Sequence, residues 1–244
     1  MGEEQQPAAT TRLAAATIDV LLSYAARATW PAGFVIYQRG APADGVFIVV
    51  EGRVILRSRV RAGRGFIPWI ATAHETFGAE GLSTAPRYTT EARADDEATT
   101  LFLSGARYRS LIREQPQQAT CLVAQILSER SALLEKLREL TTMSVEQRLI
   151  VALARMATFQ SYTRDDGCIL LSTGRYRVLC ELVGATRESV SLVLGRFAGE
   201  GLIERNGTAL IVDAGRLVHR LDELPLDDLL AAHASGIPAS SVLL

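Results

Sequence analysis

Two charged side chains and a serine stand close together in residues 184–207, GATRESVSLVLGRFAGEGLIERNG. An arginine such as Arg187 can form two hydrogen bonds with O6 and N7 of guanine, and a glutamate such as Glu188 can accept one from N4 of cytosine. With Ser191, these residues have the chemistry to read base edges in DNA. Exposed arginine and glutamate are also common on ordinary solvated helices, so the surrounding elements must decide between the two interpretations.

The periodicity around these residues predicts a helix that begins after Thr186 and ends at Gly201. The Thr186 hydroxyl can accept from the unpaired N–H groups of the first turn. An apolar stripe at helical spacing faces the core; it consists of Val190, Val193, Leu194 and Phe197. Arg187, Glu188 and Ser191 then lie on the opposite face, near the N-terminal end of the helix.

The flanking segments complete a recognisable motif. Residues 174–183 predict a short helix, and Gly184-Ala185 a turn of small residues. Residues 203–212 predict a hairpin with Asn206-Gly207 at its tip, which is the strongest short hairpin signal. Helix, turn, capped helix and hairpin together predict a winged helix-turn-helix, whose second helix fits the major groove of DNA.

The N-terminal half has a different pattern of apolar and turn-forming residues. Residues 10–27 have apolar residues at helical spacing, whereas from Trp30 to about Leu103 short Val/Ile/Phe runs alternate with Gly/Pro/Asp turns. This alternation favours an all-β sandwich or barrel. Residues 168–171 predict one further short strand near the C-terminal helices.

A long helix without turn signals follows Pro116. Apolar residues recur every three or four positions with one polar interruption, Arg130, which is typical of a helical seam; the seam consists of Val123, Ile126, Leu133, Leu137 and Leu140. The helix could pack on its own β domain, but its position between two domains favours packing on its twin in a homodimer. A second helix is expected to begin at Ser144, capped by that hydroxyl, with Glu146 and Gln147 in its first turn.

Composition sets the broad class. The chain has 244 residues, a net charge of −1, 48% hydrophobic and 22% charged residues, typical of a globular protein of about two domains. No segment predicts a membrane span or a signal peptide, so we expect a cytoplasmic protein without membrane contact. Cys121, Cys168 and Cys180 match no metal-binding spacing, and we expect reduced, mostly buried thiols, although Cys121 could act as a redox sensor.

The order of these predicted parts, a β domain followed by a long helix and a winged helix-turn-helix, resembles the Crp/Fnr family of bacterial transcription regulators. The resemblance covers roughly residues 16–220. The resemblance implies an α+β fold with an N-terminal β-roll of the double-stranded β-helix (jelly-roll) type, a long dimerisation helix and a C-terminal winged helix-turn-helix. The corresponding segments are a flexible tail (1–9), the sensor domain (10–115), the dimerisation helix (116–142), the DNA-binding domain (143–224) and a C-terminal tail (225–244).

The family's recognition helix often reads S/T-R-E-T/S-V-S/G-R-x-L, and here residues 186–194 read TRESVSLVL. The resemblance assigns base reading to Arg187, Glu188 and Ser191. Leu192 stands where an arginine is common, so we expect one guanine contact to be missing or replaced by a contact with a thymine methyl. Candidate contacts to the DNA backbone come from hydroxyls and cations that flank the two helices; they are Ser172, Thr173, Arg175, Arg177, Thr186 and Arg205.

The β segment resembles the family's cyclic-nucleotide-binding roll, with departures. The candidate effector pocket consists of Gly78, Ala79, Glu80, Arg87, Tyr88, Thr89, Leu133 and Leu134. Arg87 matches the phosphate-binding arginine, but Ala79 stands where a ribose-binding glutamate is expected, unless Glu80 takes that role. Tyr88 replaces a small hydroxyl residue, and the Leu133-Leu134 pair replaces the hydroxyls that contact adenine. We therefore expect no response to cyclic AMP; Arg87 could instead pair with a carboxylate in an empty pocket.

Other cofactors are not expected. The first cysteine is Cys121, which excludes the N-terminal iron–sulfur cluster of Fnr-type members, and His74 is the only candidate haem ligand in the β domain. No catalytic motif is present, so an enzyme is not expected. The sequence predicts a homodimeric, sequence-specific transcription regulator that binds a near-palindromic DNA operator and RNA polymerase, with an unidentified small-molecule effector or none. The alternative is a cyclic-nucleotide-binding regulatory subunit whose C-terminal helices contact a protein.

Overall fold

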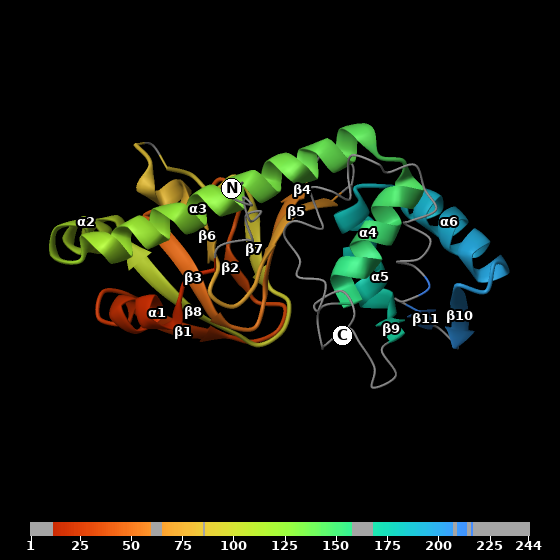
Figure 1. The fold of residues 1–244 in the computed structure, drawn as a ribbon, viewed down its shortest axis with the longest axis horizontal. Coiled ribbons are helices and arrows are strands. Elements are labelled where there is room, and N and C mark those ends of the chain that lie inside the picture. Colours follow the sequence, from red (N-terminus) through yellow and green to blue (C-terminus); the bar gives the residue numbers. More distant parts are fainter. Residues whose placement is uncertain are drawn as a thin grey trace, which may run out of the picture. The chain divides into compact units, whose positions relative to one another are not determined.

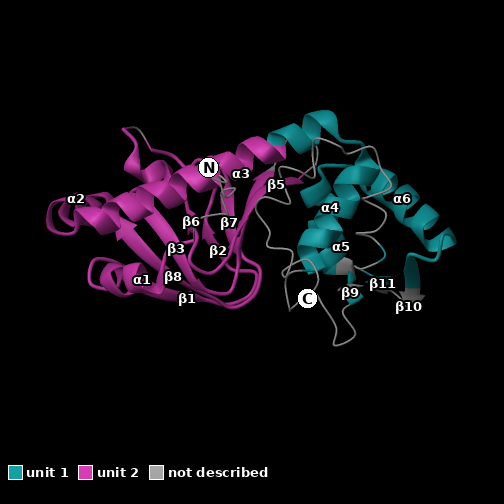
Figure 2. Cartoon of the chain, viewed as in Figure 1, with its two compact units in different colours: residues 1–9, 137–244 teal, residues 10–136 magenta. Residues whose placement is uncertain are grey.

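The computed structural model describes residues 12–59, 65–84, 86–157, 168–206, 209–213 and 216. These residues form two compact units (Figure 2). We call residues 10–136, magenta in Figure 2 and labelled unit 2 there, the first unit, and the residues from Leu137 onward, teal and labelled unit 1, the second unit. The predicted tails, residues 1–9 and 225–244, lie outside the described residues.

The first unit is built on two four-stranded antiparallel sheets, which confirms the predicted β-roll (Figure 1). One sheet has the strand order β1-β8-β3-β6 and the other the order β2-β7-β4-β5. The strands are β1 (Ala26–Trp30), β2 (Val35–Tyr37), β3 (Gly45–Glu51), β4 (Val54–Arg59), β5 (Gly65–Ala71), β6 (Thr76–Phe77), β7 (Glu91–Ala94) and β8 (Ala98–Ser104). The turn after β6 continues into a 3₁₀ helix, η1 (Ala79–Leu82).

The helix predicted over residues 10–27 is shorter than expected. Helix α1 spans Ala15–Leu21, and β1 begins at Ala26 and pairs with β8. Leu21, the last residue of α1, is fully buried, whereas Leu22 is exposed. The buried apolar face therefore ends where the helix ends. The helical spacing noted over residues 10–27 thus extends beyond α1 into β1, which is paired with β8.

Two helices follow the roll. Helix α2 (Gly105–Glu114) is capped by Ser104, whose hydroxyl accepts from the backbone N–H of Arg107. The predicted long helix is α3 (Pro116–Thr142). Proline at its first position costs no hydrogen bond, because the N–H groups of a first turn have no helical partner.

The second unit holds three helices and a small sheet: α4 (Val145–Ala157), α5 (Thr173–Val183), α6 (Arg187–Gly199), β9 (Cys168–Leu171), β10 (Ile203–Asn206) and β11 (Ala209–Asp213). The cap predicted at Ser144 is confirmed. Its hydroxyl accepts from the backbone N–H of Gln147 (3.2 Å), and the Gln147 side chain accepts from the backbone N–H of Ser144 (2.8 Å).

The three strands form one antiparallel sheet in the order β10-β11-β9, beside the helices. In the pairing of β10 with β11, Asn206 is opposite Ala209. Asn206 is the last residue of β10, and the predicted tip at Asn206-Gly207 cannot be followed further, since Gly207 lies outside the described residues.

Candidate DNA-binding interface and sensor site

The first turn of α6 is fixed by Thr186. Its hydroxyl accepts from the backbone N–H of Ser189 (3.2 Å) and lies 3.0 Å from the Ser189 hydroxyl. Gly184 adopts a left-handed conformation (φ 64°) that ends α5 and lets the chain reverse into α6 within three residues. The predicted helix-turn-helix is thus confirmed, with α6 as its second helix.

Helix α6 ends at its C-terminus as predicted, with Gly201 directly after its last turn. Gly201 has φ +72°, a conformation that favours glycine. The N–H of Leu202 donates to the carbonyl of Phe197 (2.9 Å), and the N–H of Gly201 donates to the carbonyl of Ala198 (3.2 Å). These two bonds define a Schellman motif, which satisfies carbonyls at the helix end.

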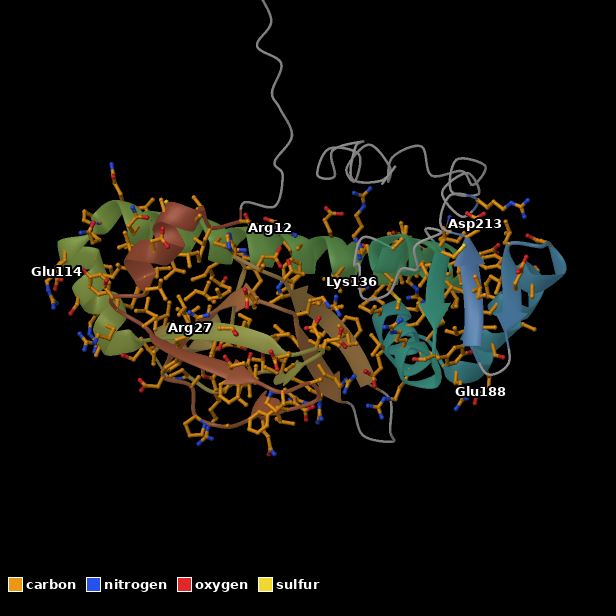
Figure 3. The ribbon with its side chains drawn as sticks, turned by 90° about the horizontal axis from the view of Figure 1, so that it is seen from below. Arg12, Arg27, Glu114, Lys136, Glu188 and Asp213 are labelled. Carbon is orange, nitrogen blue, oxygen red and sulfur yellow. The ribbon has the colours of Figure 1, made fainter. Side chains whose placement is uncertain are left out.

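One face of α6 is buried and the opposite face is exposed. Val190 and Phe197 are fully buried, Leu194 is 4% exposed, and Val193 packs partly against the same core. The predicted base readers Arg187, Glu188 and Ser191 are all exposed, and Glu188 projects from the helix (Figure 3). Leu192 is 78% exposed, which is unusual for a leucine and places it on the same outward side.

The sequence did not indicate the contact between α5 and the first turn of α6. The Arg187 guanidinium carbon lies 5.5 Å from the centre of the Tyr176 ring, and the Tyr176 hydroxyl donates to the backbone carbonyl of Arg187 (3.3 Å). Burial is the main cause that raises the pKa of Tyr176, while a hydrogen bond with Ser191 and the charge of Arg187 lower it. Tyr176 therefore contacts Arg187, one of the predicted base readers, through both its ring and its hydroxyl.

Ion pairs tie α6 and the end of α3 to α4 within the second unit. Arg196 on α6 pairs with Glu146 in the first turn of α4. Glu139, only 2% exposed, pairs with Arg155 on α4, and the Arg148 guanidinium donates to the Leu140 carbonyl (3.2 Å). Side chains thereby link α4 to α6 and to the last turn of α3.

The candidate backbone contacts have different surroundings. Ser172 and Arg177 are exposed, Arg175 is half-buried, and Thr186 caps α6. Arg177 also lies 3.9 Å from Glu181, a loose pair one turn along α5. The side chains of Thr173 and Arg205 lie outside the described residues.

In the first unit, the candidate effector residues are engaged with one another. Glu80 accepts from the backbone N–H of Thr89 (3.1 Å) and from the Thr89 hydroxyl. Arg87 is exposed, and its guanidinium donates to the Gly40 carbonyl (2.7 Å) rather than to a carboxylate. Ala79 is half-buried and offers no polar side chain.

Tyr88 belongs to an aromatic stack that the sequence did not indicate. Its ring lies 3.6 Å from the ring of Tyr37 at an interplanar angle of 9°, and Tyr37 in turn stacks on Phe77. A Cβ added at Gly78 would meet both tyrosine rings at 3.1–3.2 Å. Burial, aided by Glu80 and Asp44, raises the pKa of Tyr88 to about 12.

Helix α3 contacts this region through polar residues that precede the predicted leucines. The Thr76 hydroxyl lies within 3.4 Å of Gln125 Oε1 and of Glu129 Oε2. Burial, followed by the charge of Glu80, raises the pKa of Glu129 to about 8. Leu133 and Leu134 are 36% and 57% exposed. The structure therefore shows Gln125 and Glu129, rather than the leucine pair, in contact with β6.

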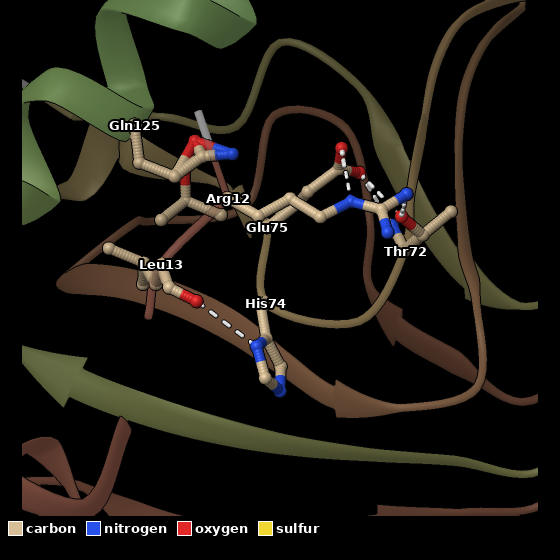
Figure 4. A network of polar contacts seen from close by, with 7 residues as sticks. Arg12, Leu13, Thr72, His74, Glu75 and Gln125 are labelled. Carbon is tan, nitrogen blue, oxygen red and sulfur yellow. Dashed lines mark hydrogen bonds and ion pairs between the residues drawn. The ribbon is translucent and has the colours of Figure 1, made fainter. Parts of the chain in front are cut away.

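His74 and two cysteines have structural surroundings. His74 has a positive φ of 70°, and its ring Nδ1 lies 3.0 Å from the Leu13 carbonyl, beside the Arg12–Glu75 pair (Figure 4). Cys180 is buried and Cys168 half-buried, but Cys121 is exposed, contrary to the expected burial. Among the described residues, no group of three or more His, Cys, Asp or Glu side chains could hold a metal ion.

The exposed stripe of α3 differs from the predicted seam. The exposed residues that recur every three or four positions are Val123, Leu127, Arg130, Leu134, Leu137 and Thr141. Ile126 instead packs partly against the core of the first unit, beside the fully buried Leu122, and Leu140 is half-buried. Leu127 and Leu134 are 54% and 57% exposed and take the places assigned to Ile126 and Leu133.

Comparisons with known proteins agree with this architecture. The family model for the cyclic nucleotide-binding domain matches residues 27–115, and the one for the Crp-like helix-turn-helix domain matches residues 147–220. The cyclic AMP receptor protein of Thermus thermophilus is 30% identical over 207 residues, which cover 84% of this chain and 92% of that protein. A CRP-like cAMP-activated global transcriptional regulator of Mycobacterium tuberculosis is 26% identical over 194 residues, or 78% of this chain and 86% of that protein.

Solved structures show the same fold. The c-di-GMP responsive global regulator CLP of Xanthomonas campestris superposes with a TM-score of 0.71 at 20% identity, covering 82% of this chain and 99% of that one. A CRP/FNR-family transcriptional regulator of Thermus thermophilus gives a TM-score of 0.69 at 22% identity, over 81% and 98% of the two chains. The fold and site define a regulator with a nucleotide-binding-like roll and a DNA-binding helix-turn-helix. The chain belongs to the Crp/Fnr family of transcription regulators. Among the described residues, no helix is long and apolar enough to cross a membrane.

Proposed function

We propose that the chain acts as a homodimer that reads a near-palindromic DNA operator through Arg187, Glu188, Ser191 and Leu192 of α6. The observation that carries this proposal is the division of α6. One face of the helix packs into the core through Val190 and Phe197, while the predicted base-reading residues are exposed beside the capped N-terminus. A helix N-terminus favours the negative charge of phosphate, so the same end can anchor the helix in the major groove.

The dimer is supported by the exposed stripe of α3. Val123, Leu127, Leu134 and Leu137 are 41–57% exposed and recur at heptad spacing. Apolar residues at this spacing favour packing against a second helix. A second copy would provide the same set of residues, as two-fold symmetry requires. Two linked recognition helices then bind half-sites about one helical turn apart.

We further propose that cyclic AMP is not the effector, although relatives of this chain are named for it. The Tyr37–Tyr88 stack is the main support, because it fills the space beside Gly78 with buried rings. Arg87 already donates to Gly40, and Glu80 already accepts from Thr89. A nucleotide would have to displace these contacts and would find an alanine at position 79.

Selection of bound sequences from a pool of randomised duplexes tests the proposal. The purified protein should enrich one near-palindromic site, and contacts with RNA polymerase can then be tested on a promoter that contains it. If no sequence were enriched over the starting pool, operator binding by α6 would be wrong. The alternative, a regulatory subunit that contacts a protein, would then be favoured.

A further inference from the structure

Tyr176 lies on α5, outside the stretch of α6 that the proposed function assigns to base reading. Its ring is partly buried and packs against the core of the second unit. A ring held by the core is a fixed platform, unlike a side chain free in solvent.

The ring supports the Arg187 guanidinium without using its hydrogen-bond donors. The guanidinium carbon lies 5.5 Å from the ring centre, within the range of a cation–π interaction. Within the described part of the chain, this guanidinium makes no hydrogen bond or ion pair. Its five N–H donors thus stay available for a partner outside the protein, and two of them suffice to grip a guanine.

The Tyr176 hydroxyl fixes the ring relative to α6. It donates to the backbone carbonyl of Arg187, in the first turn of α6 (3.3 Å). The ring, the backbone of the first turn and the reading side chain are therefore held together. Holding a flexible arginine in place before binding lowers the entropy lost when it meets its partner.

We propose that Tyr176 is a positioning residue for DNA sequence recognition, which holds Arg187 ready to grip its base and so sets the strength of preference at that base pair. This inference rests on the proposed function. Tyr176 itself need not touch DNA. Its effect should therefore be confined to the base pair that Arg187 reads and should disappear when Arg187 is absent.

The test is a randomised-site selection with the full-length chain, comparing parent, Arg187→Ala, Tyr176→Leu, Tyr176→Phe and the double variant. Tyr176→Leu should weaken preference at the Arg187 base pair by roughly two- to fivefold, the size of an exposed cation–π contact. Tyr176→Phe keeps the ring and should retain most of that preference. In the Arg187→Ala background, Tyr176→Leu should cause no further loss at this base pair.

Controls separate positioning from folding. Tyr108→Leu removes a partly buried ring from α2 in the first unit, and it should leave the sequence preference unchanged. If Tyr176→Leu lowers the melting temperature of the second unit, Tyr176→Met replaces it, because methionine fills the volume without a ring. It should give the same selective loss at the Arg187 base pair.

The outcomes are distinguishable. If the parent enriches a site and Arg187→Ala relaxes one base pair, but the Tyr176 variants change affinity for all sequences equally, the positioning role is wrong and the proposed function stands. If the parent enriches nothing, both are wrong. A loss at the same base pair that vanishes in the double variant supports the positioning role.

Discussion

The two units of this chain treat their motif residues in opposite ways. On α6, Arg187, Ser191 and Leu192 are turned to solvent, and the fold supports them from behind through a buried stripe. In the β-roll, the corresponding motif residues are already satisfied, since Glu80 binds Thr89, Arg87 binds Gly40 and Tyr88 stacks on Tyr37. A motif can thus persist in a sequence as a binding surface or as internal packing, and only the partners of its side chains distinguish the two.

The largest expected effect concerns the exposed stripe of α3, through which we propose that two copies of the chain pack together. Leu134→Asp should place two unpaired charges in an apolar seam, at a cost of several kcal/mol. The variant should sediment as a monomer at micromolar concentration. Its operator affinity should fall by about 10²-fold or more, because two linked sites become one.

Ile112→Asp is the matched control for the seam, because Ile112 is an exposed apolar residue that belongs to α2 and not to the stripe of α3. It should remain dimeric. A Leu134→Asp variant that stays dimeric, or that binds the operator as tightly as the parent, would contradict the dimer through this stripe.

The second effect compares two glycines, one in each region. A Cβ at Gly81 would lie 2.1 Å and 2.2 Å from the backbone N and O of Gly45, whereas a Cβ at Gly195 on α6 meets nothing within 4 Å. Gly81→Ala should destabilise the roll by about 3 kcal/mol through overpacking. Gly195→Ala should stabilise α6 by about 0.5–1 kcal/mol. Calorimetry of both variants measures these changes in stability. Equal changes for the two variants would contradict the contrast between the tightly packed roll and the open face of α6.

The third effect concerns pH and the half-buried Glu129 of α3. Its pKa is raised to about 8, so the folded state keeps a proton that the unfolded state releases near pH 4.5. The stability of the parent should therefore fall as pH rises from about 4.5 to about 8. Glu129→Gln should be more stable than the parent by about 1–3 kcal/mol at pH 8.5 and by much less at pH 5. Urea titrations of parent and variant at pH 5 and pH 8.5 check this. A difference in stability that is the same at both pH values would contradict a raised pKa of Glu129 as its cause.

The smallest expected effect is that of cyclic AMP on the roll. A ligand at about 100 times its dissociation constant stabilises the folded state by about 2.7 kcal/mol. Millimolar cyclic AMP should leave the melting temperature and the operator affinity unchanged, because the Tyr37–Tyr88 stack occupies the space beside Gly78. A clear rise in melting temperature would mean that the stack opens to admit the nucleotide.

The comparison also shows what could be predicted from the sequence. Local signals were sufficient for α4 and α6, because the caps at Ser144 and Thr186 and the glycine at 201 act on neighbours within three or four residues. The apolar stripe of α6 likewise depends only on helical periodicity. These features place the candidate readers on an exposed face without knowledge of the tertiary fold.

Contacts between distant segments could not be predicted. The Tyr37–Tyr88 stack and the Tyr176–Arg187 contact join residues that are neighbours only after folding. On α3, two stripes have the same three-and-four spacing, and periodicity cannot tell that Ile126 packs on the roll while Leu127 is exposed. The choice depends on where the sheet meets the helix.

The most direct test of the account is the sequence preference of Arg187→Ala. The parent should select a near-palindromic site, and the variant should lose about 1–3 kcal/mol on it and relax its preference at one base pair in each half-site, with little change in non-specific binding. Identical preferences for parent and variant would contradict the claim that the exposed end of α6 reads DNA.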